Sequence, residues 1–121
     1  MTTHDIANRY YQLATKGQWA TIREELHDEN IICQEPEKVA AWGQAVTILG
    51  REAIKAKSEA NDAMIETIHS QYCGQPIVAG SFFSLVLKRD VTFKNKPRMA
   101  KEEVCVFEVK DGKIISERFF F

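Results

Sequence analysis

The sequence predicts an α+β fold in which about three N-terminal helices pack on a strongly curved, mainly antiparallel sheet. Apolar residues recur with helical spacing up to residue 62, and polar and apolar residues alternate with strand spacing after residue 63. Asp111-Gly112 separates two such strands as a tight hairpin turn does. Helices followed by consecutive strands favour an α+β arrangement over a parallel βαβ sheet. A length of 121 residues suits one domain, residues 1–121.

Two helices are expected at the N-terminal end. The first covers residues 3–16, where apolar side chains share one face, with Thr3 as the N-cap and Gly17 as the stop. The second covers residues 18–28, with Trp19 on its apolar face. Because only Gly17 separates them, the two helices must turn sharply on each other.

The middle of the chain is expected to hold a strand and a third helix. Residues 30–35 favour a short strand that ends at Pro36, and residues 37–49 have no clean period but fold back over the core. A helix then follows Gly50 and ends near residue 62. Its apolar side is predicted to consist of Leu49, Ala53, Ala56 and Ala60.

The remaining chain is predicted to be strands and turns. The first strand covers residues 64–73, and residues 77–93 form one long bent strand with a bulge at Gly80. A turn at residues 95–97 leads to the two hairpin strands, residues 102–109 and 113–121.

Composition narrows the function classes. Sixteen basic and seventeen acidic residues give a net charge of −1 without long runs of one sign, so no nucleic-acid or membrane partner is expected. The three cysteines have no disulfide or zinc spacing and are expected to be reduced core thiols. Without an apolar leader or spanning segment, the chain is expected to be cytoplasmic. No residue pattern indicates a metal or a cofactor.

Several local phrases resemble the SnoaL-like branch of the nuclear-transport-factor-2-like superfamily. They lie at residues 8–10, 16–19, 26–30, 49–54 and 107–114 and together span nearly the whole chain in order. The resemblance implies a cone-shaped, cystatin-like fold with an apolar cavity that takes a small apolar molecule. It also implies a homodimer through the outer face of the sheet.

Comparison with the steroid isomerases of that superfamily implies roles for particular residues. Tyr10 matches the tyrosine that donates to the developing oxyanion, although a plain core tyrosine is the alternative. The general base of those enzymes falls at Gln34 or, with one inserted residue, at Glu35. The alternative for Glu35 is a solvated carboxylate at a strand end. Cys105 stands where those enzymes keep a protonated aspartate, and this departure argues against steroid isomerisation.

Strand alternation predicts which side chains of the hairpin point inward. If Cys105 faces the cavity, its strand contributes Glu103 and Phe107 as well. The last strand then contributes Ile115, Glu117, Phe119 and Phe121. Buried carboxylates need partners, and Arg98, Arg118, His69 or a water are the expected ones.

Two functions follow as hypotheses. The first is a cofactor-independent isomerase, cyclase or hydrolase that acts by acid/base chemistry on an apolar, carbonyl-bearing substrate. The second is a non-catalytic ligand-binding or dimerisation module. In the first, the catalytic candidates are Tyr10, Glu35, His69, Glu103 and Glu117. The residues expected to shape the cavity are Trp19, Trp42, Phe82, Cys105, Phe107 and Phe121.

Three further charged or imidazole positions have simpler interpretations. His69 lies in the strand at residues 64–73, on the face expected to carry Gln71 and Cys73, and its alternative is a structural role. His27 lies at a helix end and needs no role beyond its charge there. Asp90 and Arg98 flank a turn and are expected to form a surface ion pair.

Overall fold

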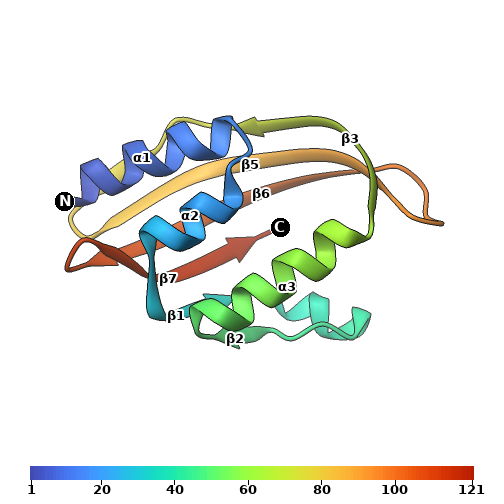
Figure 1. The fold of residues 1–121 in the computed structure, drawn as a ribbon, viewed down its shortest axis with the longest axis horizontal. Helices are drawn as coiled ribbons and strands as arrows, with labels where there is room; N and C mark the ends of the chain where they lie inside the picture. Colours follow the sequence, from blue (N-terminus) through green and yellow to red (C-terminus); the bar gives the residue numbers. More distant parts are fainter.

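The computed structural model describes residues 1–121 and confirms the α+β class (Figure 1). In chain order its elements are α1 (Thr3–Thr15), α2 (Trp19–Leu26), β1 (His27–Gln34), the 3₁₀ helix η1 (Glu37–Trp42), β2 (Thr47–Leu49), α3 (Arg51–Ala63), β3 (Ile65–Cys73), β4 (Ile77–Ala79), β5 (Phe82–Phe93), β6 (Met99–Lys110) and β7 (Lys113–Phe120). Even α1 and α3, with 13 residues each, are too short to cross a bilayer, and no helix qualifies as a membrane span.

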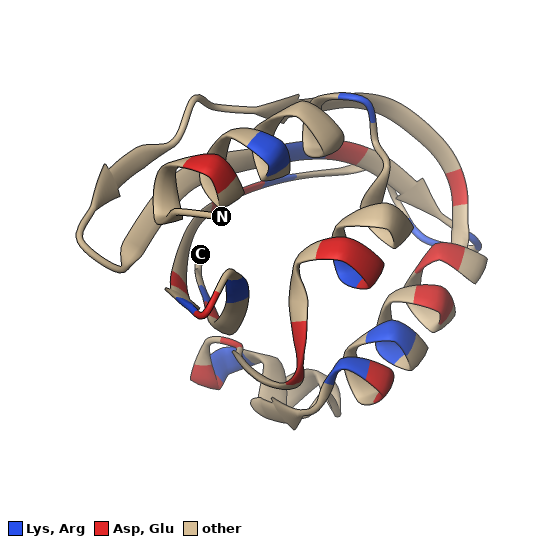
Figure 2. Ribbon diagram, turned by 60° about the vertical axis from the view of Figure 1, so that its left-hand side comes forward, with Lys and Arg blue, Asp and Glu red and all other residues tan.

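The strands form one seven-stranded sheet in the order β2-β1-β7-β6-β5-β3, with β4 paired to β5. Every pair is antiparallel except β1 with β7, which is parallel. Figure 2 shows the sheet bending around the helices, with basic and acidic positions intermixed along α3. The face toward the helices is called the inner face below.

The first helix has the expected amphipathic character. Its buried side chains include Ile6, Tyr10 and Leu13. The N-cap is Thr2 rather than Thr3, because the Thr2 hydroxyl accepts from the Asp5 amide while the Asp5 carboxylate accepts from the Thr2 amide.

The helix α3 has the expected bounds but buries a different face. Ile54 is its buried side chain, and the predicted alanine side is exposed. The small alanine side chains offer little apolar area, whereas Ile54 lets the helix pack on β1 and β2. This rotation also turns Lys57 toward the interior, where it reaches Glu35.

Gly80 makes a turn and not a bulge. With φ 58° it joins β4 to β5 as a tight hairpin in which Ala79 pairs with Phe82. The predicted long strand over residues 77–93 is therefore wrong, because it is two strands. Phe83, not Phe82, becomes the first inner residue of β5 and is fully buried.

The hairpin at Asp111-Gly112 is confirmed. Both residues have positive φ, 51° and 75°, as a type I′ turn requires. A register shift between Glu108 and Val109 sits just before the turn, and it places Ile114 inside. The prediction that Ile115 faces inward is wrong for this reason, whereas Glu117 beyond the shift does face inward.

Cross-strand pairing arranges the inner face in four rows. The first row is Phe83, Phe107, Glu117 and Cys33; the second is Leu85, Cys105 and Phe119; the third is Cys73, Leu87 and Glu103; the fourth is Gln71, Arg89 and Lys101. The first two rows are mainly apolar and buried in the core. The fourth row is wholly polar, so polarity increases with distance from the Asp111-Gly112 turn.

Candidate functional site

Tyr10 lies in an aromatic cluster at the centre of the fold. Its ring centroid is 4.7 Å from that of Phe107, 5.8 Å from Phe83 and 6.5 Å from Trp19. Burial raises the pKa of the Tyr10 hydroxyl well above its ordinary value, and the nearby Glu117 carboxylate raises it further. Tyr10 therefore remains a neutral hydrogen-bond donor.

A buried histidine and carboxylate meet in the first row. The His27 Nε2 atom lies 3.4 Å from Glu117 Oε2, and the side chains are 4% and 7% exposed. The His27 Nδ1 atom is buried without a hydrogen-bond partner. Burying an unpaired carboxylate costs several kcal/mol, roughly, so the imidazole is the partner that Glu117 needs here. It is not one of the partners expected from the sequence.

His27 is the site residue that sequence reasoning missed. The sequence places it at the end of an amphipathic helix, and α2 does end at Leu26, but β1 begins at His27 with no connecting residue. The parallel pairing then puts His27 opposite Ile114, on the inner side of β7. No local pattern in the sequence signals this, because the partner strand lies at the other end of the chain.

Polar side chains continue from this pair along β1 and α3. The Cys33 thiol interacts with Glu117, and Glu35 is the next inward residue beyond it. The Lys57 Nζ atom lies 2.6 Å from Glu35 Oε1, whose side chain is 11% exposed. Gln34 turns the other way and accepts a hydrogen bond from the Thr47 hydroxyl at 2.9 Å. Both alternatives for the base position border the cavity where β1 and β7 end, and Glu35 is the one that carries a largely buried carboxylate.

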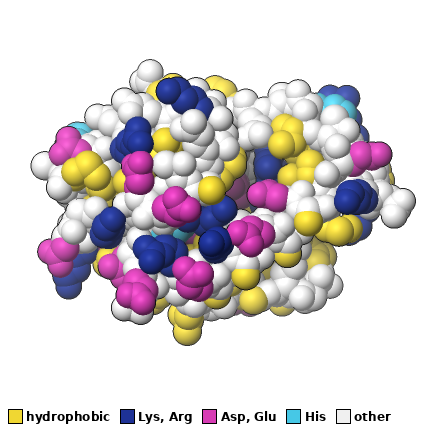
Figure 3. Space-filling view, in the orientation of Figure 1, with side chains coloured by type: hydrophobic (Ala, Val, Ile, Leu, Met, Phe, Trp, Pro, Cys, Tyr) yellow, Lys and Arg dark blue, Asp and Glu magenta, His cyan; other side chains and the backbone are white.

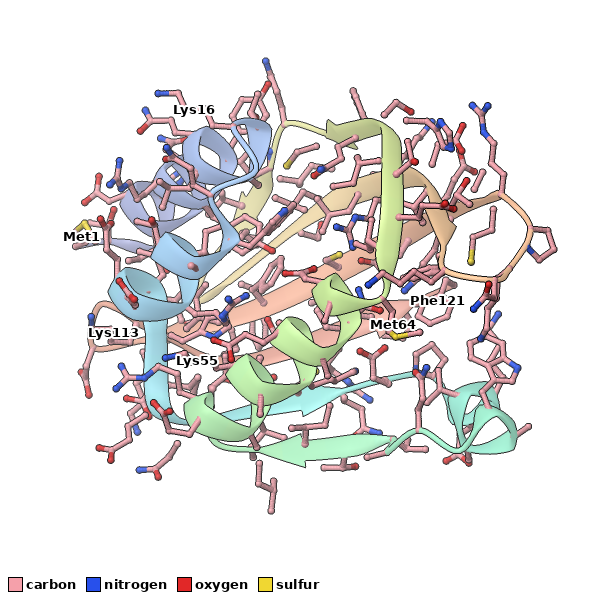
Figure 4. The ribbon with its side chains drawn as sticks, turned by 45° about the vertical axis from the view of Figure 1, so that its right-hand side comes forward. Met1, Lys16, Lys55, Met64, Lys113 and Phe121 are labelled. Atoms are coloured by element: carbon pink, nitrogen blue, oxygen red, sulfur yellow. The ribbon has the colours of Figure 1, made fainter.

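Glu35 forms part of the wall of a cavity of about 320 Å³. The cavity lies where β1 and β7 end. Its apolar walls are Phe119, Phe120 and Phe121, and the polar residues Gln34, Glu37 and Arg118 line it as well. Figure 4 looks past α3 toward the inner face, where side chains from the helices and the sheet converge. An acid/base group and an apolar surface are thus available to the same small molecule.

The carboxylate of Glu103 has partners on its own strand. Lys101 Nζ lies 3.2 Å from Glu103 Oε2, and the Cys105 thiol donates to Glu103 Oε1 at 3.8 Å. Lys101 also sits 4.0 Å from the centroid of the Phe121 ring, a cation–π contact. Glu103 therefore belongs to a charged group between the cavity wall and the fourth row.

Three predicted site residues lie away from the interior. His69 is exposed and shares a 2.8 Å hydrogen bond with the Thr92 hydroxyl; a register shift in β3 puts it on the outer face. Phe82 is 50% exposed on the outer face, and Trp42 is 60% exposed on η1. The Asp90–Arg98 pair is present at 2.8 Å as an exposed ion pair, as expected.

Nothing in the arrangement resembles a metal centre. No group of three or more His, Cys, Asp or Glu side chains is placed to hold an ion. The three cysteines are free and buried, which confirms the expectation of core thiols.

The His27–Glu117 pair gives a direct stability prediction. His27→Leu and Glu117→Leu should each lower the free energy of unfolding by about 3 kcal/mol, because each leaves one buried polar group without its partner. The double variant should cost clearly less than the sum, as urea unfolding followed by circular dichroism measures.

The exposed Arg9–Glu25 pair is the matched control. Its side chains are 40% and 43% exposed. The two single leucine variants and the double variant of this pair should therefore give a coupling free energy of about 1 kcal/mol or less. Strictly additive losses for His27 and Glu117 would show that the two side chains are not energetically coupled.

The cysteines give a chemical prediction. Burial raises the pKa of Cys73 to about 11, and burial with nearby carboxylates raises the pKa of Cys33 and Cys105 further. At pH 8 about one Cys73 thiol in a thousand is then the reactive thiolate. Ellman's reagent should therefore react slowly with the native protein, at Cys73 first, and rapidly with all three thiols in guanidinium. Fast reaction in the native protein would contradict these environments.

Comparison with known proteins agrees with this architecture. The sequence model of the SnoaL-like domain matches residues 1–121. A crystal structure from Mesorhizobium loti, named both as a SnoaL-like polyketide cyclase and as a carbohydrate phosphatase, is 32% identical, with all of both chains covered and a TM-score of 0.91. None of the curated proteins matches.

Two more distant structures share the fold alone. A Xanthomonas campestris protein with a cystatin-like fold is 19% identical over 99% of this chain and 90% of its own, with a TM-score of 0.78. A Catenulispora acidiphila protein with a ketosteroid isomerase-like fold, in complex with trimethylamine, is 20% identical over 79% and 69%, with a TM-score of 0.64. The full-length match of the family model and the 32% identical relative together show that this chain belongs to the SnoaL-like family.

Proposed function

We propose that this protein is a cofactor-independent enzyme that transfers protons on a small, carbonyl-bearing molecule with an apolar body. The observation that carries the proposal is the Glu35 carboxylate, 11% exposed, in the wall of a cavity of about 320 Å³ beside Phe119 and Phe121. A carboxylate in such a place can take a proton from a carbon next to a carbonyl and return it elsewhere.

Two basic side chains support this role. At 2.6 Å the Lys57 ammonium group holds the Glu35 carboxylate in position. Arg118 lines the same cavity and can donate hydrogen bonds to the oxygen on which negative charge develops. A base and an electrophilic donor would then flank the same carbonyl group.

The groups behind the cavity complete the proposed chemistry. Cys33 pairs with Glu117 across β1 and β7, two residues before Glu35, and Glu117 contacts His27. These residues lie between the cavity wall and the aromatic cluster, where Tyr10 remains protonated. Of the two activities in the name of the Mesorhizobium loti relative, polyketide cyclase and carbohydrate phosphatase, the first supports a carbonyl-bearing substrate class.

The outer face of the sheet favours a second candidate function, a ligand-binding or dimerisation module. Val86, Val104 and Phe120 pair across three neighbouring strands and are 36%, 46% and 51% exposed. A continuous apolar row on a sheet face is typical of a surface that another protein covers. A second copy of the chain would present the same row, so a symmetric homodimer is the proposed partner.

Solvent exchange tests the enzymatic proposal without knowledge of the product. In D₂O, the protein should accelerate deuterium incorporation next to the carbonyl of a cyclic ketone such as 2-tetralone, as followed by NMR. Glu35→Gln should lower this rate about 100-fold or more, since it removes the proton acceptor.

Glu29→Gln is the matched control, because Glu29 lies on β1, the strand that leads to Glu35, and is exposed. It should exchange 2-tetralone at the wild-type rate. If a panel of ketones, lactones and steroids gives neither catalysed exchange nor a thermal shift, the module alternative replaces the enzyme.

Sedimentation tests the dimer. The wild-type protein should sediment as a dimer, and Val104→Arg should give a monomer, because it places a charge in the middle of the apolar row. Asn8→Arg, which adds the same charge on the exposed face of α1, should leave the dimer intact. A monomeric wild-type protein would remove the homodimer from the proposal.

A further inference from the structure

A second cavity, of about 260 Å³, lies between the α1–α2 turn, the end of α3 and the strands β3 and β5. Its lining combines apolar and polar side chains: Trp19, Ile65, Ile68, Asp62, Gln71 and Arg89. Figure 3 shows this face of the molecule hollowed between α2 and α3, with basic, acidic and apolar side chains around the recess. None of these residues takes part in the chemistry proposed at Glu35.

Arg89 is the unusual group in this cavity. Its Nε atom is buried and has no hydrogen-bond partner in the protein. Its nearest carboxylate is Asp62, whose Oδ1 atom is 4.0 Å from an Arg89 Nη atom, beyond hydrogen-bond distance. Buried polar donors are nearly always paired, so an Arg89 donor without an acceptor in a cavity wall indicates an acceptor from outside the chain.

The residues next to Arg89 in the sheet do not accept a hydrogen bond from its Nε–H group. In the fourth row Arg89 pairs with Gln71 on β3 and with Lys101 on β6. Lys101 forms an ion pair with Glu103 at 3.2 Å and a cation–π contact with the Phe121 ring. The Glu103 carboxylate therefore pairs with Lys101 and not with Arg89. Arg89 is therefore the cation at this level of the inner face whose nearest carboxylate lies beyond hydrogen-bond distance.

We propose that this cavity binds the carboxylate of a small amphipathic molecule. The Arg89 guanidinium presents Nε–H and Nη–H as a fork that matches two carboxylate oxygens. Trp19, Ile65 and Ile68 supply the apolar surface for an aromatic or aliphatic body. This binding does not depend on the reaction proposed at Glu35 and holds for a ligand that is only bound.

The charges around the cavity favour a monoanion over a phosphate. A single guanidinium faces the carboxylate of Asp62 at 4.0 Å, and Glu103 lies beyond Lys101. Because Asp62 shares the charge of Arg89, one added negative charge meets less repulsion here than the two charges of a phosphate dianion. The volume of about 260 Å³ also suits a ligand smaller than a typical drug molecule.

Calorimetric titration with 2-naphthoate and its neutral analogue 2-naphthamide tests the proposal. The wild-type protein should bind the acid at least about tenfold more tightly than the amide. Arg89→Gln should abolish this preference. Lys88→Gln is the matched control, because Lys88 is the next residue on β5, is exposed on the outer face and pairs with Glu102; it should leave both affinities unchanged.

Asp62→Asn gives an independent readout if Arg89→Gln does not fold. The Asp62 side chain is 55% exposed at the end of α3, so its replacement should leave the fold intact. Removing the competing carboxylate should tighten 2-naphthoate binding severalfold without changing 2-naphthamide binding. The proposal is overturned if the wild type does not prefer the acid, if folded Arg89→Gln retains the preference, or if Asp62→Asn weakens acid binding. These titrations do not depend on the deuterium exchange experiment, so the carboxylate site and the proposed enzyme can each be disproved separately.

Discussion

The parallel pairing of β1 with β7 is the constraint on which the rest of the structure depends. It joins a strand that starts at His27 to the last strand of the chain, while every other pair is antiparallel. This one pairing brings Cys33 opposite Glu117 and carries Glu35 to the cavity near Phe119. Bringing together two strands so far apart in the sequence costs chain entropy. The apolar contacts of the first row must form together with this pairing to offset that cost. The same apolar packing then isolates the His27–Glu117 pair from water.

Local sequence patterns predicted those parts of the fold that local interactions determine. The Asp111-Gly112 turn, the bounds of α3 and the inward direction of Glu117 all depend on neighbouring residues, and each is as expected. Residues whose direction depends on an irregularity were misplaced, because a register shift or an extra turn changes the face of the residues on one side of it. Ile115 and Phe82 are examples, displaced by the shift at Glu108 and the turn at Gly80.

The candidate site was predicted in part, and the missing part has a physical reason. Glu35 and Tyr10 are largely buried, whereas both alternatives for the base position, Gln34 and Glu35, border the same cavity. His27 could not be identified, because its partner Glu117 lies 90 residues along the chain. Lys57 lies outside the apolar side predicted for α3, because three alanines imitate an apolar face that carries too little area to be buried.

The junction between α2 and β1 limits how this chain can vary. Because no residue separates Leu26 from His27, the helix fixes both the position and the phase of the strand that follows. One inserted residue here would exchange the two faces of β1, sending Cys33 outward and Gln34 inward. Length changes are better tolerated at the exposed turn around Lys96, which touches no inner row. Relatives that retain a histidine and a glutamate at these positions are therefore expected to differ in loop length at Lys96 and not at this junction.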